Sequence, residues 1–333
     1  MSFDSYDQLQ PYAVKGCGII RQIPQARIVE IETGRGCTRS VGCSFCTEPV
    51  KNTLQWRRAE DIIEEVRTCM RLGVSAFRLG KQCCIFSYEG GDAAKIERLL
   101  SGLAELKPEV LHVDNANPAM VTEERVKLFV KYLTAGSTAA MGVESFDPEV
   151  AKLNNLNCTK EMAFEAVRTI NRFGSERGEN GCPAFLPGIN ILLGLEGESK
   201  ETLDKNFAAL KQLLDDGLLV RRINIRQVVP FPGTRLYEVT GDKFLRKNRR
   251  YYGAWTDKVR HEIDLPMLRR VFPKGTILRR LRSEVHHGEV TFLRQVGSYP
   301  IIVGVHERLP LGEFFEVRIT DHMLRSLTGE VLR

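Results

Sequence analysis

Three cysteines that could bind a metal centre, Cys37, Cys43 and Cys46, lie within ten residues in a glycine-containing loop. The loop follows an alternating apolar segment, residues 27–33, that is typical of a β-strand. A closed structural zinc site takes four ligands, and no fourth Cys or His lies near these three. A [4Fe–4S] cluster takes cysteine ligands, and three of them leave one iron open for a substrate or cofactor. We therefore expect the chemistry at that iron.

Two alternatives remain open for these thiols. They could hold a zinc ion with a distant ligand such as Cys17, Cys83 or a histidine, or they could be unrelated buried thiols, because free cysteine is a common core residue. Disulfides are disfavoured. The chain has nine cysteines, an odd number, no secretory signal segment, and at 333 residues it needs no covalent staples.

The cysteine loop resembles the cluster loop of the radical S-adenosylmethionine (radical SAM) superfamily. Its Cys-x5-Cys-x2-Cys spacing is two residues longer between the first pair than the usual Cys-x3-Cys-x2-Cys. Three later segments are similar, in order, to the branch that contains tRNA methylthiotransferases and elongator-type acetyltransferases. They are residues 142–149, residues 190–203, in which Glu196 replaces the usual proline, and residues 230–234. The resemblance covers roughly residues 28–237.

The first two thirds of the chain alternate between strand and amphipathic helix patterns, which predicts a parallel sheet. We expect its strands at residues 27–33, 74–80, 111–115, 138–143, 189–193 and 223–229. The resemblance implies an α/β fold, a partial (βα)6 barrel of the TIM type with its reactive face at the C-terminal ends of the strands. The segments that carry the resemblance fall at those ends.

The resemblance also implies what the cysteines and the strand ends do. Cys37, Cys43 and Cys46 would ligate a [4Fe–4S] cluster, whose open iron would chelate the amino and carboxylate groups of S-adenosylmethionine (SAM). One electron from the cluster would break a C–S bond of SAM and release a 5′-deoxyadenosyl radical that abstracts a substrate hydrogen. The residues expected to contact SAM are Gly80, Glu144, Ser145, Asn190, Gly194, Gly197 and Arg226.

Several candidate residues have an alternative role. Glu144 and Ser145 could cap the helix that follows them. Arg226 on the sixth strand could pair with the SAM carboxylate or with a substrate phosphate, since an inward arginine is costly unless it is paired. Cys83 and Cys84, after the second strand, are catalytic candidates as a radical-quenching thiol, an extra metal ligand or a covalent anchor, or else plain core residues. The acidic residue usual for the family at this exit is missing.

The composition changes in the last third. Residues 240–282 contain thirteen Lys and Arg against four Asp and Glu, a net charge of +9. Since the whole chain has a net charge of +6, the residues outside this segment have a net charge of −3. Tyr251, Tyr252 and Trp255 lie among these cations. Because cations neutralise phosphates and exposed rings stack on bases, this segment is predicted to bind RNA. The alternative is a solvated basic helix whose rings pack on the barrel.

Five short alternating segments near the C-terminus predict a small closed β-barrel. They cover residues 276–281, 288–292, 301–305, 314–319 and 327–332. Residues 315–320 and 327–329 are similar to a TRAM module, the OB-like RNA-binding domain that ends tRNA methylthiotransferases. A barrel used only for packing or dimerisation is the alternative.

The patterns divide the chain into an N-terminal extension, a radical SAM partial barrel, a basic helical linker and a TRAM-like barrel, at residues 1–26, 27–240, 241–272 and 273–333. We expect a radical SAM enzyme that cleaves SAM to modify RNA, with tRNA as the leading candidate, held by the linker and the small barrel. Only Cys17 precedes Cys37, so methylthiotransfer with a second cluster is not expected.

A radical SAM enzyme that modifies a protein side chain or a cofactor precursor is the main alternative, and a zinc-stabilised RNA-binding protein is a third. The expected partners include a reductant protein, with an accessory subunit as an option. No apolar run of about 18 residues occurs, so no membrane partner is expected. Free thiols and the lack of a signal segment predict a cytoplasmic location.

Overall fold

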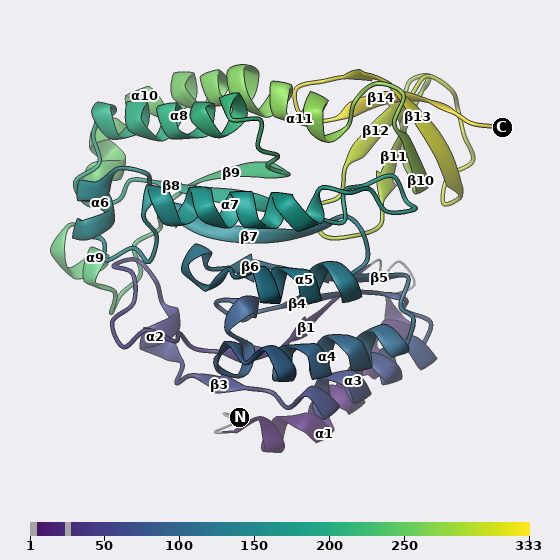
Figure 1. Cartoon of the computed structure of the whole chain (residues 1–333), viewed down its shortest axis with the longest axis horizontal. Coiled ribbons are helices and arrows are strands. Elements are labelled where there is room, and N and C mark those ends of the chain that lie inside the picture. The colour runs from purple at the N-terminus through teal and green to yellow at the C-terminus, as the bar shows by residue number, and fades with distance from the viewer. Residues whose placement is uncertain (1–4, 24–27) are drawn as a thin grey trace.

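The computed structural model describes residues 5–23 and 28–333, and its largest part is an open parallel barrel (Figure 1). One sheet has the strand order β1 (Val29–Glu32), β4 (Ala76–Gly80), β5 (Val110–Val113), and the other β6 (Asn115–Ala116), β7 (Ser137–Glu144), β8 (Phe185–Leu193), β9 (Arg222–Gln227). Only Asp114 separates β5 from β6, so the two sheets continue into each other as six strand positions. Every pairing is parallel. The predicted partial (βα)6 barrel is confirmed.

Amphipathic helices cover one side of the strands. They are α3 (Ala59–Arg71), α4 (Ala93–Glu105), α5 (Glu123–Tyr132), α7 (Lys160–Gly174) and α8 (Lys200–Asp215), and they follow one another in chain order (Figure 1). Local chemistry sets where they begin, since the side chains of Asp92 and Ser199 accept hydrogen bonds from the first-turn N–H groups of α4 and α8. In α3, the buried Ile62, Val66 and Cys69 lie on one face at helical spacing.

Short elements fill the connections between these strands and helices. They are α1 (Tyr6–Gly16), η1 (Cys17–Gln22), β2 (Gly34–Arg35), α2 (Glu48–Lys51), β3 (Gln55–Trp56), η2 (Ile85–Gly91), η3 (Pro118–Met120), α6 (Pro148–Leu153) and α9 (Arg235–Val239). Within residues 5–23 and 28–333, no helix combines the length and the apolarity that a membrane span requires.

β8 is longer than the predicted strand at residues 189–193, because it begins at Phe185. Pro187 and Gly188 disfavour a strand assignment from sequence. In the structure, a Cβ at Gly188 would lie 3.1 Å from the Thr138 side chain and 3.3 Å from that of Arg222. The glycine therefore leaves room for the side chains of Thr138 on β7 and Arg222 on β9.

The basic segment forms helix α10 (Lys243–Val259), a π-helical turn η4 (Arg260–Asp264) and helix α11 (Leu265–Val271). Tyr252 and Trp255 are buried, at 4% and 7% exposure, and the Trp255 indole N–H donates to the Leu203 carbonyl oxygen at 2.7 Å. The hypothesis that these two rings stack on bases is therefore wrong. They pack against α8, as predicted by the alternative of a basic helix whose rings pack on the barrel. Tyr251 is half-buried.

The C-terminal strands close into the predicted small β-barrel. Its order is β10 (Ile277–His287), β11 (Val290–Gln295), β12 (Ile302–Val305), β14 (Leu327–Val331), β13 (Phe314–His322), and β13 pairs with β10 to close the ring. β10 extends further than expected, because Gly288, at φ 60°, lies in the turn to β11 rather than in a strand.

The β11–β12 connection docks the small barrel onto the partial barrel. The Ser298 N–H donates to His112 Nδ1 at 2.9 Å, and the Tyr299 hydroxyl donates to the Asp114 carboxylate. Burial lowers the pKa of His112 to about 4, so its ring is neutral and Nδ1 is free to accept. These contacts join the small barrel to the third strand position.

A buried carboxylate, Glu198, joins helix α10 to the end of β8. It accepts the Gly194 N–H at 3.0 Å and the Tyr252 hydroxyl, while the Asn248 side chain donates to the Glu198 carbonyl oxygen at 2.8 Å. Burial raises the pKa of Glu198 to about 7. The donors support its ionised form, so the anchor of α10 depends on them.

Tyr252→Phe should therefore destabilise the chain in a pH-dependent way. The folded pKa of Glu198, about 7, lies above its usual 4.5, so this group favours folding below pH 4.5 and that contribution is lost as the pH rises through 7. Without the Tyr252 donor the loss is larger. We expect a cost of about 1–3 kcal/mol in unfolding free energy at pH 8 and a smaller cost at pH 5, measured by denaturant unfolding.

The matched control is Tyr251→Phe, since the Tyr251 hydroxyl has no hydrogen-bond partner among the described residues. Its unfolding free energy should stay within about 0.5 kcal/mol of the parent chain at both pH values. An equal cost of Tyr252→Phe at pH 5 and pH 8 would contradict the assigned role of Glu198.

Candidate functional site

The three loop cysteines line one cavity of about 420 Å³ at the C-terminal ends of the barrel strands. Four other predicted site residues from the strand ends line the same cavity: Cys83, Cys84, Glu144 and Asn190. The fold thus brings together candidates from β4, β7 and β8 around the cysteine loop.

Backbone pairing and a glycine turn shape the cysteine loop. Its start, β2, pairs with β3, and within it the Cys46 N–H donates to the Cys43 carbonyl oxygen at 3.0 Å. Gly36 has φ 81°, and a Cβ there would lie 2.6 Å from the Leu54 backbone nitrogen, so glycine is required at this position. The Gly36 N–H also donates to the Glu48 carboxylate at 3.1 Å.

A fully buried asparagine that follows α6, Asn154, ties the loop to the end of β8. Its Oδ1 accepts the Ser44 hydroxyl at 2.6 Å and the Glu196 N–H at 3.2 Å. Its Nδ2 donates to the carbonyl oxygens of Val150 at 2.8 Å and of Glu196 at 2.9 Å. The Asn155 side chain donates to two loop carbonyl groups at 3.0 Å. Hydrogen bonds from the segments that follow β7 and β8 therefore fix the cysteine loop.

The three thiols differ in their surroundings. A hydrogen bond from the Cys83 thiol lowers the pKa of Cys37 to about 6, whereas burial raises the pKa of Cys43 to about 11 and also raises that of Cys46. Arg39 Nη1 lies 3.6 Å from Cys43 Sγ, and the Arg39 N–H lies 3.5 Å from Cys37 Sγ. Such donors favour the thiolate form that a metal ligand needs.

The donor set fits a cluster better than a single ion. In the part of the chain that the structure describes, no three His, Cys, Asp or Glu side chains converge to hold one metal ion. A zinc ion needs its ligands within about 2.0–2.3 Å of one point. A [4Fe–4S] cluster takes separate thiolates at different corners, which is what three thiols around one cavity provide.

The adjacent thiols of Cys83 and Cys84 have different environments. Cys84 is 2% exposed and its Sγ accepts the Asn117 N–H at 3.2 Å, so it is a core residue at the cavity wall. Cys83 is half-buried and donates to Cys37. Of the two, Cys83 is the thiol that contacts the cysteine loop.

Glu144 ends β7 in a left-handed conformation, at φ 64°, where the register against β8 shifts. Burial raises its pKa to about 8, an effect that Arg226 partly offsets. No described residue donates a hydrogen bond to its carboxylate. A half-buried carboxylate on a strained backbone, with no donor among the described residues, suits a ligand amine or hydroxyl. Asp147 caps helix α6, so neither Glu144 nor Ser145 is the capping residue, although the Ser145 hydroxyl accepts the Asp147 N–H at 3.2 Å.

The other predicted cofactor contacts lie outside the cavity lining. The Ser145 hydroxyl is buried and donates to Asn206 Oδ1 at 3.3 Å. Gly194 and Gly197 have φ 92° and 84°, so the chain turn itself requires glycine there. The Glu30 side chain packs over Gly80 and occupies the space that a Cβ would fill. Arg226 is exposed on β9.

Lys81, which the sequence places at the second-strand exit, lies in the cavity wall, and sequence reasoning missed other polar residues there, among them Glu30, Gln82, Asn115 and Asn117. Gln82 is 1% exposed, and its Oε1 accepts the Thr33 hydroxyl at 3.0 Å. Its Nε2 has no hydrogen-bond partner among the described residues. A buried donor left unsatisfied costs about 1–3 kcal/mol, so it fits a site that a ligand acceptor completes. Its position directly after a strand end was the available signal.

Comparison with known proteins gives a family for this chain. A family model described as the radical SAM superfamily matches residues 31–209, more than half of the sequence. An uncharacterized protein of Methanocaldococcus jannaschii is 45% identical over 99% of this chain and 65% of its own length.

More distant relatives carry named activities. The ribosomal protein uS12 methylthiotransferase RimO of Clostridioides difficile is 21% identical over 91% of this chain and 66% of its own length. A probable threonylcarbamoyladenosine tRNA methylthiotransferase of Archaeoglobus fulgidus is 25% identical over 91% of this chain and 67% of its own length. The chain spans about two thirds of the length of the curated relatives it matches.

Alanine at Cys37, Cys43 or Cys46 should each abolish binding of about four iron and four sulfide per chain, because three thiolates are the ligands available in the loop. Iron and labile sulfide assays with visible absorption after anaerobic reconstitution measure this. The matched control is Cys83→Ala, which removes a thiol that touches Cys37 but lies outside the loop, and it should keep the iron. Zinc without labile sulfide in the parent chain would rule the assignment out.

Proposed function

Because the chain belongs to the radical SAM superfamily, we propose that it is an enzyme that modifies RNA, with tRNA as its substrate. Enzymes of this superfamily use a [4Fe–4S] cluster and SAM. The observation that carries the assignment of the site is the convergence of Cys37, Cys43 and Cys46 on one cavity. These cysteines would hold the cluster, which would supply the electron for reductive cleavage of SAM.

The chain's own residues bind and orient the cofactor and the substrate. Glu144 offers a shielded carboxylate to an amine or hydroxyl, and Gln82 offers an amide donor without a partner in the described residues. Asn190 lines the same cavity, and its Oδ1 accepts from Asn224 of β9 at 3.2 Å. A radical must be kept from water until it meets its C–H bond, and the strand ends and the cysteine loop shield the cavity on the sides that they form.

Three observations support an RNA substrate. One distant relative is named a tRNA methylthiotransferase. The chain ends in a closed five-stranded barrel, an architecture that proteins use to bind oligonucleotides. On α10, the exposed Lys243, Lys247, Arg249 and Arg250 have no acidic partner among the described residues. Unpaired cations in a row attract a phosphate backbone.

Modification of a protein side chain is the second candidate, since another distant relative is named for ribosomal protein uS12. Salt dependence separates the two candidates. Binding of RNA should weaken steeply as salt rises, because neutralised phosphates release their counterions, whereas binding of a peptide should respond less.

The experiment combines tRNA binding with product analysis. Anaerobic enzyme with SAM, a reductant and cellular tRNA should release 5′-deoxyadenosine and alter one nucleoside, detected by mass spectrometry. Replacing Lys243, Lys247, Arg249 and Arg250 by Gln should reduce the slope of log K against log salt by about 3–4. The matched control replaces Lys127 and Lys131 of α5, which are paired with Glu123 and Glu97. If tRNA bound no better than a neutral polymer at low salt, the RNA proposal would fail.

A further inference from the structure

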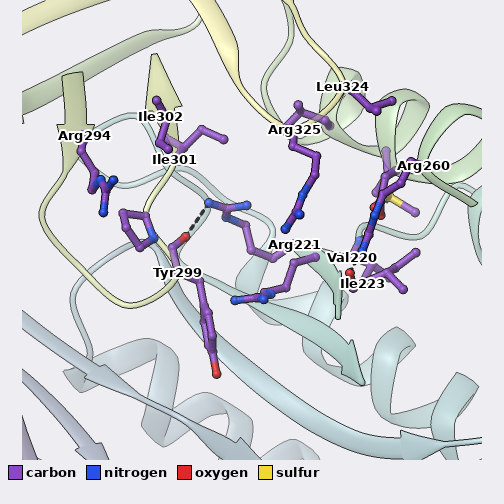
Figure 2. A pocket seen from close by; sticks show the side chains of 15 residues that line it. Val220, Arg221, Ile223, Arg260, Arg294, Tyr299, Ile301, Ile302, Leu324 and Arg325 are labelled. Carbon is purple, nitrogen blue, oxygen red and sulfur yellow. Dashed lines mark hydrogen bonds and ion pairs between the residues drawn. The ribbon is translucent and has the colours of Figure 1, made fainter. Parts of the chain in front are cut away.

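A second cavity, of about 370 Å³, lies where the small barrel meets the last strand of the partial barrel (Figure 2). Its wall comes from the start of β9, from η4 and α11, and from the β11–β12 and β13–β14 connections. Five arginines line it together with a single acidic residue, Asp264; they are Arg221, Arg222, Arg260, Arg294 and Arg325. Its residues are separate from those of the cysteine cavity.

Two of these arginines are neutralised inside the chain. Arg260 pairs with Asp264 and also donates to the Ile223 carbonyl oxygen at 2.8 Å. Arg294 pairs with Glu284 at 3.0 Å. These contacts fix the rim of the cavity without adding net charge to it.

The other three guanidinium groups make no ion pair with a carboxylate among the described residues, although Asp264, the partner of Arg260, also interacts electrostatically with Arg222 and Arg325. Arg221 donates to the Tyr299 carbonyl oxygen at 2.7 Å, a contact drawn in Figure 2. Arg222 donates to Asn224 Oδ1 at 3.2 Å and lies over the Tyr299 ring, 4.2 Å from its centroid. Arg325 has no hydrogen-bond or ion-pair partner in the described residues, and its side chain points into the cavity (Figure 2).

Three like charges in one partly enclosed space are unfavourable without an anion. Burial lowers the pKa of both Arg221 and Arg222, and Arg325 adds to the effect on Arg222 by repulsion. Arginine nevertheless stays protonated in proteins, so the charges persist. A bound anion would remove the repulsion and satisfy the free N–H donors.

The lining also indicates the kind of anion. Guanidinium forks match the geometry of phosphate oxygens. Met267, Leu268, Ile301 and Ile302 provide apolar walls beside the arginines. The volume of about 370 Å³ lies in the range of about 300–1,000 Å³ that is typical of small-molecule sites, so it can admit more than a bare ion. Such a cavity suits a nucleotide, whose phosphate would contact the arginines and whose base would contact the apolar wall.

We propose that this cavity binds a phosphate group of a nucleotide, and that this is a phosphodiester of the RNA substrate. The inference deepens the proposed function and rests on it for the source of the phosphate. Inorganic phosphate, a free nucleotide and an RNA strand all present this chemistry. The test must therefore separate them.

A row of polar side chains connects the two cavities. Arg222, Asn224 and Arg226 alternate along β9 and so share one face of this edge strand. Asn224 donates to Asn190, which lines the cysteine cavity. The charge of Arg226 acts on Glu144 in that cavity and partly offsets the rise in its pKa. At about 3.3 Å per residue, the row from Arg222 to Arg226 spans about 13 Å. A strand held at the arginine cavity could thus reach the cysteine cavity along β9.

The experiment measures binding of three probes to the full chain with its cluster: inorganic phosphate, AMP and a short single-stranded oligoribonucleotide. Arg325→Gln is the main variant, because Arg325 is exposed and its loss should leave the fold intact. Arg222→Gln is the second. The matched control is Arg318→Gln, which removes the same charge from an exposed ion pair of the small barrel outside the cavity.

We expect Arg325→Gln and Arg222→Gln each to weaken the oligoribonucleotide about 10- to 100-fold, the loss of one charge-assisted contact, and Arg318→Gln to stay within about twofold. Iron content and thermal unfolding should not change in Arg325→Gln. AMP should compete with the oligoribonucleotide for the parent chain. These results together would support the proposal.

Equal affinity of Arg325→Gln, Arg222→Gln and the parent chain for all three probes would overturn it. Losses confined to phosphate and AMP would overturn the RNA assignment and identify a free-nucleotide site. Competition by an acidic peptide but not by AMP would overturn phosphate binding. If tRNA is modified while the variants bind normally, the cavity proposal fails and the proposed function stands. If the variants lose affinity but no RNA is modified, the anion site stands alone.

Discussion

The buried side chain of Asn154 is the contact on which the geometry of the cysteine loop depends. The loop has little regular structure, so its shape comes from what it is bonded to. Asn154 makes four hydrogen bonds at full burial, to the loop, to its own helix and to the turn at Glu196. A buried amide with all its groups satisfied fixes one arrangement of its neighbours. The positions of the three cysteines in space therefore depend on the segments that follow β7 and β8, to which Asn154 bonds the loop.

The two cavities place different chemistry in two parts of the protein, and only the arginine cavity is lined by residues of the edge strand β9. At the C-terminal ends of the strands lie thiols and a shielded carboxylate, and at the start of β9 lie unpaired guanidinium groups. Among the described strands β9 pairs with β8 alone, so it is an edge strand of the open barrel. An open barrel edge lined by polar side chains admits a long substrate more readily than a closed barrel would. The contact from Asn224 of β9 to Asn190 of β8, which lines the cysteine cavity, connects the two regions.

Features carried by local sequence were predictable, and features made by distant contacts were not. Hydrophobic alternation located the six barrel strands and the five strands of the small barrel, and spacing pointed to Cys37, Cys43 and Cys46, which line one cavity. The arginine cavity needed the fold, because Arg222 and Arg325 meet only after the small barrel docks. Tyr252 and Trp255 were misjudged from their charged neighbours. Their three-residue spacing, continued by Val259, was the local sign of a buried helix face.

The docking of the small barrel explains why so much charge can lie inside the open barrel. Tyr299 enters from the β11–β12 connection, donates to Asp114 and stacks under Arg222, while Arg78 pairs with Asp114 at 3.6 Å and with Glu30. Each charge in this chain of contacts has an opposite or aromatic neighbour, which offsets the cost of its desolvation. This series of contacts ends at Arg222, which makes no ion pair with a carboxylate among the described residues. The surplus positive charge therefore accumulates at the junction of the two barrels, where an external anion can reach it.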